Sequence, residues 1–219
     1  MMANSSFLFS RDLYVEEFTR VGKFLVYSYN QMVKKHHFLH SNYETYIRNV
    51  FVKQYLRDKK AKVKFDVGYL LFEVESGEID INNNTVGFID IKVLNLGSND
   101  LTDEDEYYSI ECKRLDGSKT KNRLYIDEGI RRYTLSKYSS QMPFAAMIGF
   151  VEKGTSQQIV QDINYLLAEK TDLITFSLLN HHQFEDTFNE SYKSEHKRIN
   201  SNYDQIVLYH LMFDVKSII

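Results

Sequence analysis

The chain has 219 residues, of which 43% are hydrophobic and 26% charged, which is enough apolar material for one sizeable core and too much for a disordered chain. One Cys excludes an internal disulfide framework and a Cys-rich zinc module, and we expect a reduced, cytoplasmic protein. With no charged-then-apolar leader and no long uncharged apolar run, neither secretion nor membrane spanning is expected. The net charge of −3, taken alone, argues against an indiscriminate nucleic-acid binder.

The first part of the chain has helical periodicity. Apolar residues recur at helical spacing over Arg11–Met32 and predict a long first helix. A second helix is predicted over Tyr43–Leu56, with Ser41 or Asn42 as its cap. A basic run, Arg57–Lys64, follows it.

Three segments with alternating polar and apolar residues then predict strands: Phe65–Ile81, Thr85–Leu96 and Tyr107–Leu115. The polar and acidic stretch Gly97–Glu106 separates the last two. We therefore expect a β-hairpin with a long solvated tip.

The second half alternates helices and strands. We predict helices over Asn122–Tyr138 and Ser156–Lys170, and strands over Phe144–Val151 and Gln205–Val215. The nearly continuous apolar run Phe144–Val151 is typical of a strand that is buried on both faces. The polar stretch Asn180–Asn202 fits no pattern. This order predicts an α/β fold with one mixed β-sheet flanked by helices.

The hairpin contains the residues that indicate chemistry. Because side chains alternate along a strand, Glu111 and Lys113 project to one face and Cys112 to the other, as a small buried residue. With the loop centred near residue 101, the partner of residue n is about 202 − n, so Asp90 falls opposite the Glu111–Lys113 segment. Asp80 is a rival that lies ten residues earlier in the chain, and we prefer Asp90.

Two carboxylates beside one ammonium group suit Mg²⁺ or Mn²⁺, with phosphate oxygens and water as further ligands. Such an ion would polarise a phosphate and activate water, while Lys113 could position that water or stabilise charge in the transition state. The alternative is a set of solvated cross-strand ion pairs. Glu195-His196-Lys197 has the same Glu-x-Lys spelling without a strand pattern or an opposing aspartate, so the prediction rests on the strand context and on Asp90.

The arrangement of Asp90 and Glu111-Cys112-Lys113, followed by a helix and an apolar strand, resembles the PD-(D/E)XK nuclease superfamily, with Ile89 in place of the proline. From about residue 44 to the end, the chain is similar to small bacterial restriction-endonuclease-like proteins. Four segments in order carry this similarity: Glu44–Arg48 with Tyr55-Leu56, Tyr125–Tyr133 with Lys137–Ser139 and Met147–Val151, Tyr192–Arg198, and Leu208–Asp214.

The resemblance implies a restriction-endonuclease-like core over residues 41–219 of a single domain (1–219), after an N-terminal helical extension (1–40). It implies that Asp90 and Glu111 are metal ligands, that Lys113 is the catalytic lysine, and that Glu44 is an additional acidic residue at the metal site. The implied activity is Mg²⁺- or Mn²⁺-dependent hydrolysis of nucleic acid, expected to be DNA, in restriction or phage defence.

Two alternatives stay open. One is a catalytically silent module of the same fold that binds nucleic acid or a protein partner. The other is an unrelated α/β protein in which the hairpin charges are structural. A homodimer is conceivable under the nuclease hypothesis, because cutting both strands of a duplex needs two sites.

Three further groups have both a functional and a structural interpretation. Tyr125, Glu128 and Arg132 share a helix face and could brace the site or contact a phosphate, or Glu128 and Arg132 could form an ordinary i,i+4 ion pair. Arg114 could bind phosphate or cap the base of the hairpin. The positive cluster Lys193–Arg198, which contains His196, could contact a nucleic-acid backbone or be a solvated loop.

The net charge averages an acidic hairpin tip with basic stretches at Lys53–Lys64, Lys113–Arg123 and Lys193–Arg198. Because the charges are separated along the chain, the net charge is only weak evidence against nucleic-acid binding.

Overall fold

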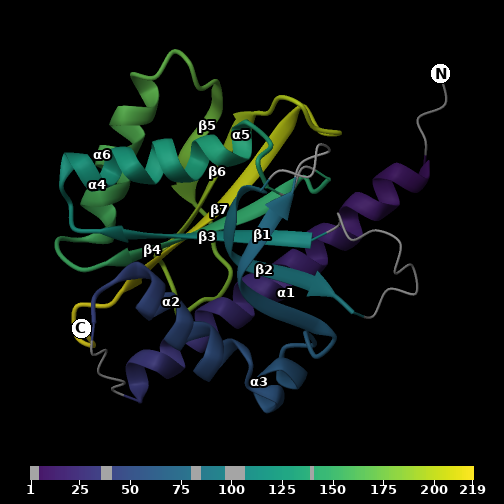
Figure 1. The fold of residues 1–219 in the computed structure, drawn as a ribbon, viewed down its shortest axis with the longest axis vertical. Helices are drawn as coiled ribbons and strands as arrows, with labels where there is room; N and C mark the ends of the chain where they lie inside the picture. The colour runs from purple at the N-terminus through teal and green to yellow at the C-terminus, as the bar shows by residue number, and fades with distance from the viewer. Residues whose placement is uncertain (1–4, 36–40, 80–84, 97–106, 139–140) are drawn as a thin grey trace.

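The computed structural model describes residues 5–35, 41–79, 85–96, 107–138 and 141–219. Its centre is a seven-stranded mixed sheet with the strand order β1-β2-β3-β4-β7-β6-β5 (Figure 1). The strands are β1 (Leu70–Ile79), β2 (Thr85–Asn95), β3 (Tyr107–Leu115), β4 (Phe144–Val151), β5 (Thr175–His181), β6 (Ser191–Lys197) and β7 (Gln205–Asp214).

Helices precede and connect the strands. They are α1 (Ser5–Lys34), α2 (Glu44–Phe51) with its π-helical continuation η1 (Val52–Leu56), α3 (Lys59–Lys64), α4 (Lys119–Tyr125) with the π-helical η2 (Ile126–Ile130) and α5 (Arg131–Thr134), and α6 (Ser156–Ala168). No helix in the described part of the chain is long and apolar enough to cross a membrane.

The sheet combines antiparallel and parallel pairs. Strands β1, β2 and β3 form an antiparallel meander, and β3, β4 and β7 run parallel. Strands β6 and β5 extend the other side in antiparallel fashion. The parallel centre needs helical crossovers, and its middle strand β4 is buried along its whole length, as its apolar sequence predicts.

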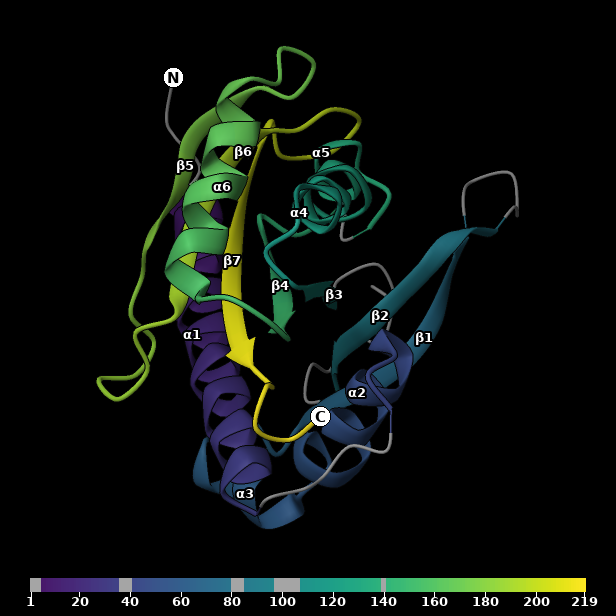
Figure 2. The same cartoon turned by 90° about the vertical axis from the view of Figure 1, so that its left-hand side faces the viewer.

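Strand β4 separates two apolar clusters, one on each face of the sheet. Ala146 and Ile148 belong to the cluster that contains the buried residues of α1 and α2. Ala145 and Met147 belong to the cluster that contains the buried residues of α4 and α6. The protein is therefore a three-layer α/β/α structure, and Figure 2 shows the long α1 beside the sheet.

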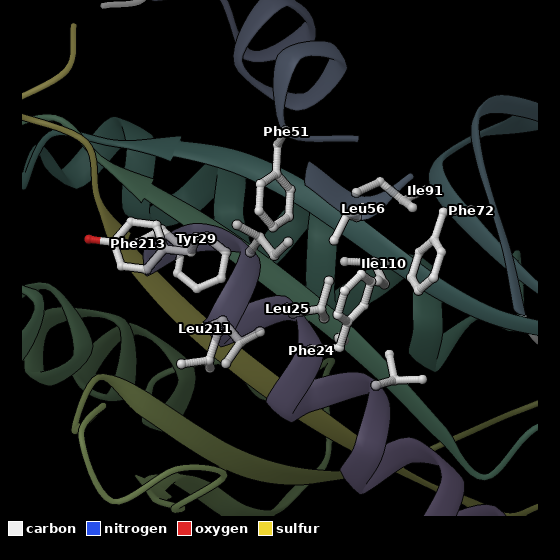
Figure 3. Close-up of a cluster of buried hydrophobic side chains, with 14 of the residues drawn as sticks. Phe24, Leu25, Tyr29, Phe51, Leu56, Phe72, Ile91, Ile110, Leu211 and Phe213 are labelled. Atoms are coloured by element: carbon white, nitrogen blue, oxygen red, sulfur yellow. The ribbon is translucent and has the colours of Figure 1, made fainter. Parts of the chain in front are cut away.

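Helix α1, which we expected to be an N-terminal extension, packs directly on the sheet. Its Phe24 and Leu25 are buried in the same cluster as Ile110 of β3 (Figure 3). Its Tyr29 stacks on Phe213 of β7, with ring centroids 4.3 Å apart. The apolar stripe predicted from the sequence is thus covered by the strands that position the hairpin residues.

The α/β class and the mixed sheet flanked by helices are confirmed, whereas two local predictions are wrong. Tyr43, without a side-chain hydrogen bond, is the N-cap of α2, rather than Ser41 or Asn42. Glu195-His196-Lys197 belongs to strand β6, not to an unpatterned stretch. Asp80 and the predicted hairpin tip (97–106) lie outside the described residues.

Candidate metal and catalytic site

The site is located where β2 and β3 stop pairing. The antiparallel ladder runs up to the pair Ile91 and Ile110, and the same register would place Asp90 beside Glu111. At that point Asp90 Oδ2 accepts a hydrogen bond from the backbone N–H of Cys112, at 2.8 Å. The register expected from the sequence is therefore correct to within one residue.

Glu111 is the most enclosed acidic residue of the site, with 1% of its side chain exposed. Its Oε1 lies 2.6 Å from Lys113 Nζ and accepts a second hydrogen bond, at 2.7 Å, from Arg132 Nη1 of α5. Its Oε2 is buried and has no hydrogen-bond partner among the described residues. One oxygen of this carboxylate thus contacts two cations, while the other is left for a further ligand.

Glu44 approaches from the first turn of α2. Its Oε2 accepts the backbone N–H of Arg114 at 2.9 Å, and its Oε1 lies 3.6 Å from Lys113 Nζ. The helix therefore places this carboxylate beside Lys113. Its role as a metal ligand remains a prediction.

Arg48, one helical turn after Glu44, was not predicted to have a role. Its Nη1 lies 2.5 Å from Asp90 Oδ1, and its Nη2 lies 2.8 Å from Glu75 Oε1 of β1. The i,i+4 spacing of Glu44 and Arg48 on one helix face was a signal that could have identified Arg48. Glu75 has no comparable signal in the sequence.

Burial and charge shift the pKa values of these groups. Burial, followed by the charge of Asp90, raises the pKa of Glu111 to about 7. Burial opposes the charged form of Lys113, but the carboxylates of Glu111 and Glu44 outweigh it and raise the pKa of Lys113. Lys113 therefore stays protonated at neutral pH and can donate hydrogen bonds, but it cannot act as a base.

The acidic residues fit a divalent ion held by two carboxylates. The described residues contain no group of three or more His, Cys, Asp or Glu side chains that could hold a metal ion. Mg²⁺, however, is usually bound by one or two carboxylates, with water and substrate phosphates as its other ligands. Asp90 and Glu111 offer hard oxygen donors, and the unpaired Glu111 Oε2 is a free donor atom.

Two groups that we considered for the site are engaged elsewhere. The guanidinium group of Arg114 makes a two-point contact with Glu152, at 2.5 and 2.8 Å, which leaves it paired within the protein. Tyr125 is buried, and its hydroxyl lies 2.9 Å from His210 Nδ1. Arg132 donates a hydrogen bond to Glu111, in agreement with the interpretation that it braces the site.

The predicted positive cluster near the C-terminus is not a solvated loop. His196 and Arg198 are buried. Arg198 donates hydrogen bonds to the carbonyl oxygens of Met142 and Tyr138, at 2.7 and 2.6 Å. These two residues therefore hold the fold together and are not available to a phosphate. Cys112 is buried, as predicted.

Comparisons with protein-family models, curated proteins and solved structures found no match. The relation to the PD-(D/E)XK superfamily therefore remains a resemblance, based on Asp90, Glu111-Cys112-Lys113 and the four sequence segments named above.

Proposed function

We propose that the protein is a Mg²⁺- or Mn²⁺-dependent nuclease with a restriction-endonuclease-like core, which hydrolyses phosphodiester bonds of nucleic acid, expected to be DNA. The observation that carries the proposal is the convergence of Asp90, Glu111 and Lys113 at the end of the β2–β3 ladder. The unpaired, buried Glu111 Oε2 adds a donor atom that an ion would satisfy. Restriction or phage defence is the proposed setting.

The side chains divide the chemistry between them. Asp90 and Glu111 would hold the ion, which when bound polarises the phosphate and lowers the pKa of a coordinated water. Lys113, held protonated beside Glu111, can orient that water or stabilise negative charge on the phosphate. Arg132 fixes the Glu111 carboxylate from the opposite side through its 2.7 Å hydrogen bond.

Basic side chains near this end of β3 suit an anionic substrate. Lys121 lies close enough to Glu44 to favour its ionised form, although burial raises the pKa of Glu44 overall. The hydrogen bonds of Asp116 with Ser118 are the main cause that lowers the pKa of Asp116, and the charges of Lys121 and Lys153 lower it further. One of the three basic stretches is therefore next to the candidate site, where contacts to a phosphate backbone would position a strand.

A catalytically silent module of the same fold is the second candidate. It is favoured by the pairing of the carboxylates with cations: Arg48 with Asp90, and Lys113 and Arg132 with Glu111. A site whose charges are already compensated can persist without an ion. In that case the domain would bind nucleic acid or a protein partner without cleaving it.

Cleavage assays on purified protein distinguish the two candidates. Glu111→Ala and Lys113→Ala should abolish Mg²⁺- or Mn²⁺-dependent cleavage of DNA and RNA substrates, with the fold verified by circular dichroism. Glu195→Ala and Lys197→Ala, which alter the other Glu-x-Lys triplet on β6, are matched controls and should cleave like the unmodified protein. Equal cleavage by all four variants would refute the site assignment. Nucleic-acid binding without cleavage by the unmodified protein would favour the silent module.

A further inference from the structure

We propose that Arg48 is a built-in counter-ion of Asp90 that competes with the divalent ion for this carboxylate, and that Glu75 retains the guanidinium group when the ion binds. The inference rests on the proposed function, because it concerns the same metal site. It assigns a role to two residues that the nuclease resemblance leaves without one.

Arg48 is a fixed and enclosed cation. Only 2% of its side chain is exposed, and all three guanidinium nitrogens have acceptors. Nε and Nη2 donate to Asn49 Oδ1 at 3.2 and 3.1 Å, Nη1 contacts Asp90, and Nη2 also contacts Glu75. The planar group therefore lies in one orientation between the two carboxylates, and arginine keeps its charge at all ordinary pH values.

Both oxygens of Asp90 are occupied in this arrangement. Oδ1 contacts Arg48, and Oδ2 accepts the N–H of Cys112. An ion that binds Asp90 must therefore share Oδ2 with the N–H of Cys112, or share Oδ1 with the guanidinium group or displace it. Two cations on one carboxylate repel each other, so the ion and the guanidinium group compete for Asp90.

Glu75 is placed to hold the guanidinium group during this exchange. The β1–β2 ladder pairs Val74 with Ile91 and Ser76 with Ile89, and it skips Glu75 and Asp90, which stand opposite each other between those pairs. Glu75 has a φ of 53°, in the left-handed region that non-glycine residues rarely adopt. Such a conformation persists only where the surrounding structure imposes it, and it often marks a functional position.

The two carboxylates differ in their access to solvent. The side chain of Glu75 is 57% exposed, whereas that of Asp90 is 14% exposed. Glu75 can therefore keep an ion pair with Arg48 at the surface while Asp90 turns to the ion inside the site. Arg48 then sets the affinity for the metal, and it holds the Asp90 carboxylate in place when no metal is bound.

The test is the affinity for Mn²⁺, measured by electron paramagnetic resonance without nucleic acid on the full chain. Arg48→Gln should bind Mn²⁺ about tenfold more tightly, because the competing cation is gone. Glu75→Gln should bind it several-fold more weakly, because Arg48 then has Asp90 as its only carboxylate partner. Arg48→Lys keeps the charge and should stay close to the unmodified protein. Glu73→Gln, on the same strand, is the control and should not change the affinity.

The outcomes separate the inference from the proposed function. One outcome is that the unmodified protein binds Mn²⁺ and that Asp90→Asn abolishes this binding. If Arg48→Gln then binds Mn²⁺ no more tightly than the unmodified protein, the competition is wrong and the metal site stands. If the unmodified protein does not bind Mn²⁺, the proposed function itself fails. Should Arg48→Gln not fold, Glu75→Gln decides alone, because its side chain is exposed: an unchanged Mn²⁺ affinity would overturn the inference.

Discussion

Lys113 Nζ lies 2.6 Å from Glu111 Oε1, and both side chains come from one face of strand β3. The two-residue spacing makes this contact possible, because alternate residues of a strand share a face. The contact is nearly excluded from water, so each group strongly affects the charge of the other. The predicted activity depends on this pair remaining ionised.

Lys113→Met removes the ammonium group and preserves most of the side-chain volume. Among the described residues, Glu111 would then keep only the ion pair with Arg132, and its pKa should rise further above its ordinary value. We expect cleavage to fall about 100-fold or more. Single-turnover cleavage measures the loss, and a rate within twofold of the unmodified protein would exclude a catalytic role for Lys113.

Arg132→Gln tests whether the helix after β3 supports the site. Arg132 holds Glu111 at 2.7 Å, so its loss should weaken cleavage about tenfold while Lys113 remains in place. The neighbouring Arg131 pairs with Asp127 and Asp172 away from Glu111, so Arg131→Gln is the matched control. If the two variants cleave equally well, Arg132 does not position Glu111.

Two buried histidines should make stability depend on pH. His196 and His210 contact Ser194 Oγ, each at 2.7 Å, and burial lowers the pKa of His196 to about 4 and that of His210 well below its ordinary value. The folded state therefore resists protonation, while the unfolded chain takes up protons near pH 6.5. The stability that neutral His196 contributes is complete above about pH 6.5 and is lost as the pH falls toward about 4, and the contribution of neutral His210 likewise is complete above about pH 6.5 and declines at lower pH.

The measurement is the free energy of unfolding in urea at pH 7.5 and pH 5. His196→Gln should remove about 2 kcal/mol of the difference between the two pH values. The exposed His181 on β5 offers the control, because His181→Gln should leave the difference intact. A pH dependence that is the same in both variants would show that His196 does not cause it.

The side chain of Asn122 of α4 should lower the free energy of unfolding of the unmodified protein. Its side chain is fully buried, and neither Nδ2 nor Oδ1 has a hydrogen-bond partner among the described residues. Asn122→Leu, which removes the unpaired polar atoms at similar volume, should raise the free energy of unfolding by about 1–3 kcal/mol.

Asn164 of α6 provides the comparison, because its amide is paired in both directions with the backbone of Leu179, at 2.9 Å. Asn164→Leu should therefore destabilise the protein in the same urea titration. If Asn122→Leu destabilises to the same extent, the amide of Asn122 has an internal partner such as a bound water.

The sequence was sufficient to predict the elements that follow a simple period. The apolar run Phe144–Val151 identified the buried centre strand, and alternation on either side of a loop centred near residue 101 gave the β2–β3 register to within one residue. The period is local, so it can be read without knowledge of the fold. Strand β6 was missed because its inward residues include Ser194 and His196, which form a buried polar network where an apolar face would be expected.

The pairings that Arg48, Glu75 and Arg132 make around the site could not be predicted from the sequence in the same way. Arg48 and Glu75 come from a helix and a strand that meet only in the folded chain, and Arg132 could as well have paired with its own helix neighbour. Their contacts depend on tertiary packing and on an irregular backbone at Glu75. The acidic residues and Lys113 were predicted because the strand period and the family pattern coincide at those positions.

A crystal structure of the full chain soaked in Mn²⁺ tests the central claim most directly. The proposed site predicts one anomalous peak about 2.1 Å from oxygens of both Asp90 and Glu111, with Glu111 Oε2 among its ligands and Arg48 moved toward Glu75. The claim would be contradicted by the absence of an anomalous peak between the two carboxylates at saturating Mn²⁺. In that case Asp90 would still be paired with Arg48, and Glu111 with Arg132 and Lys113.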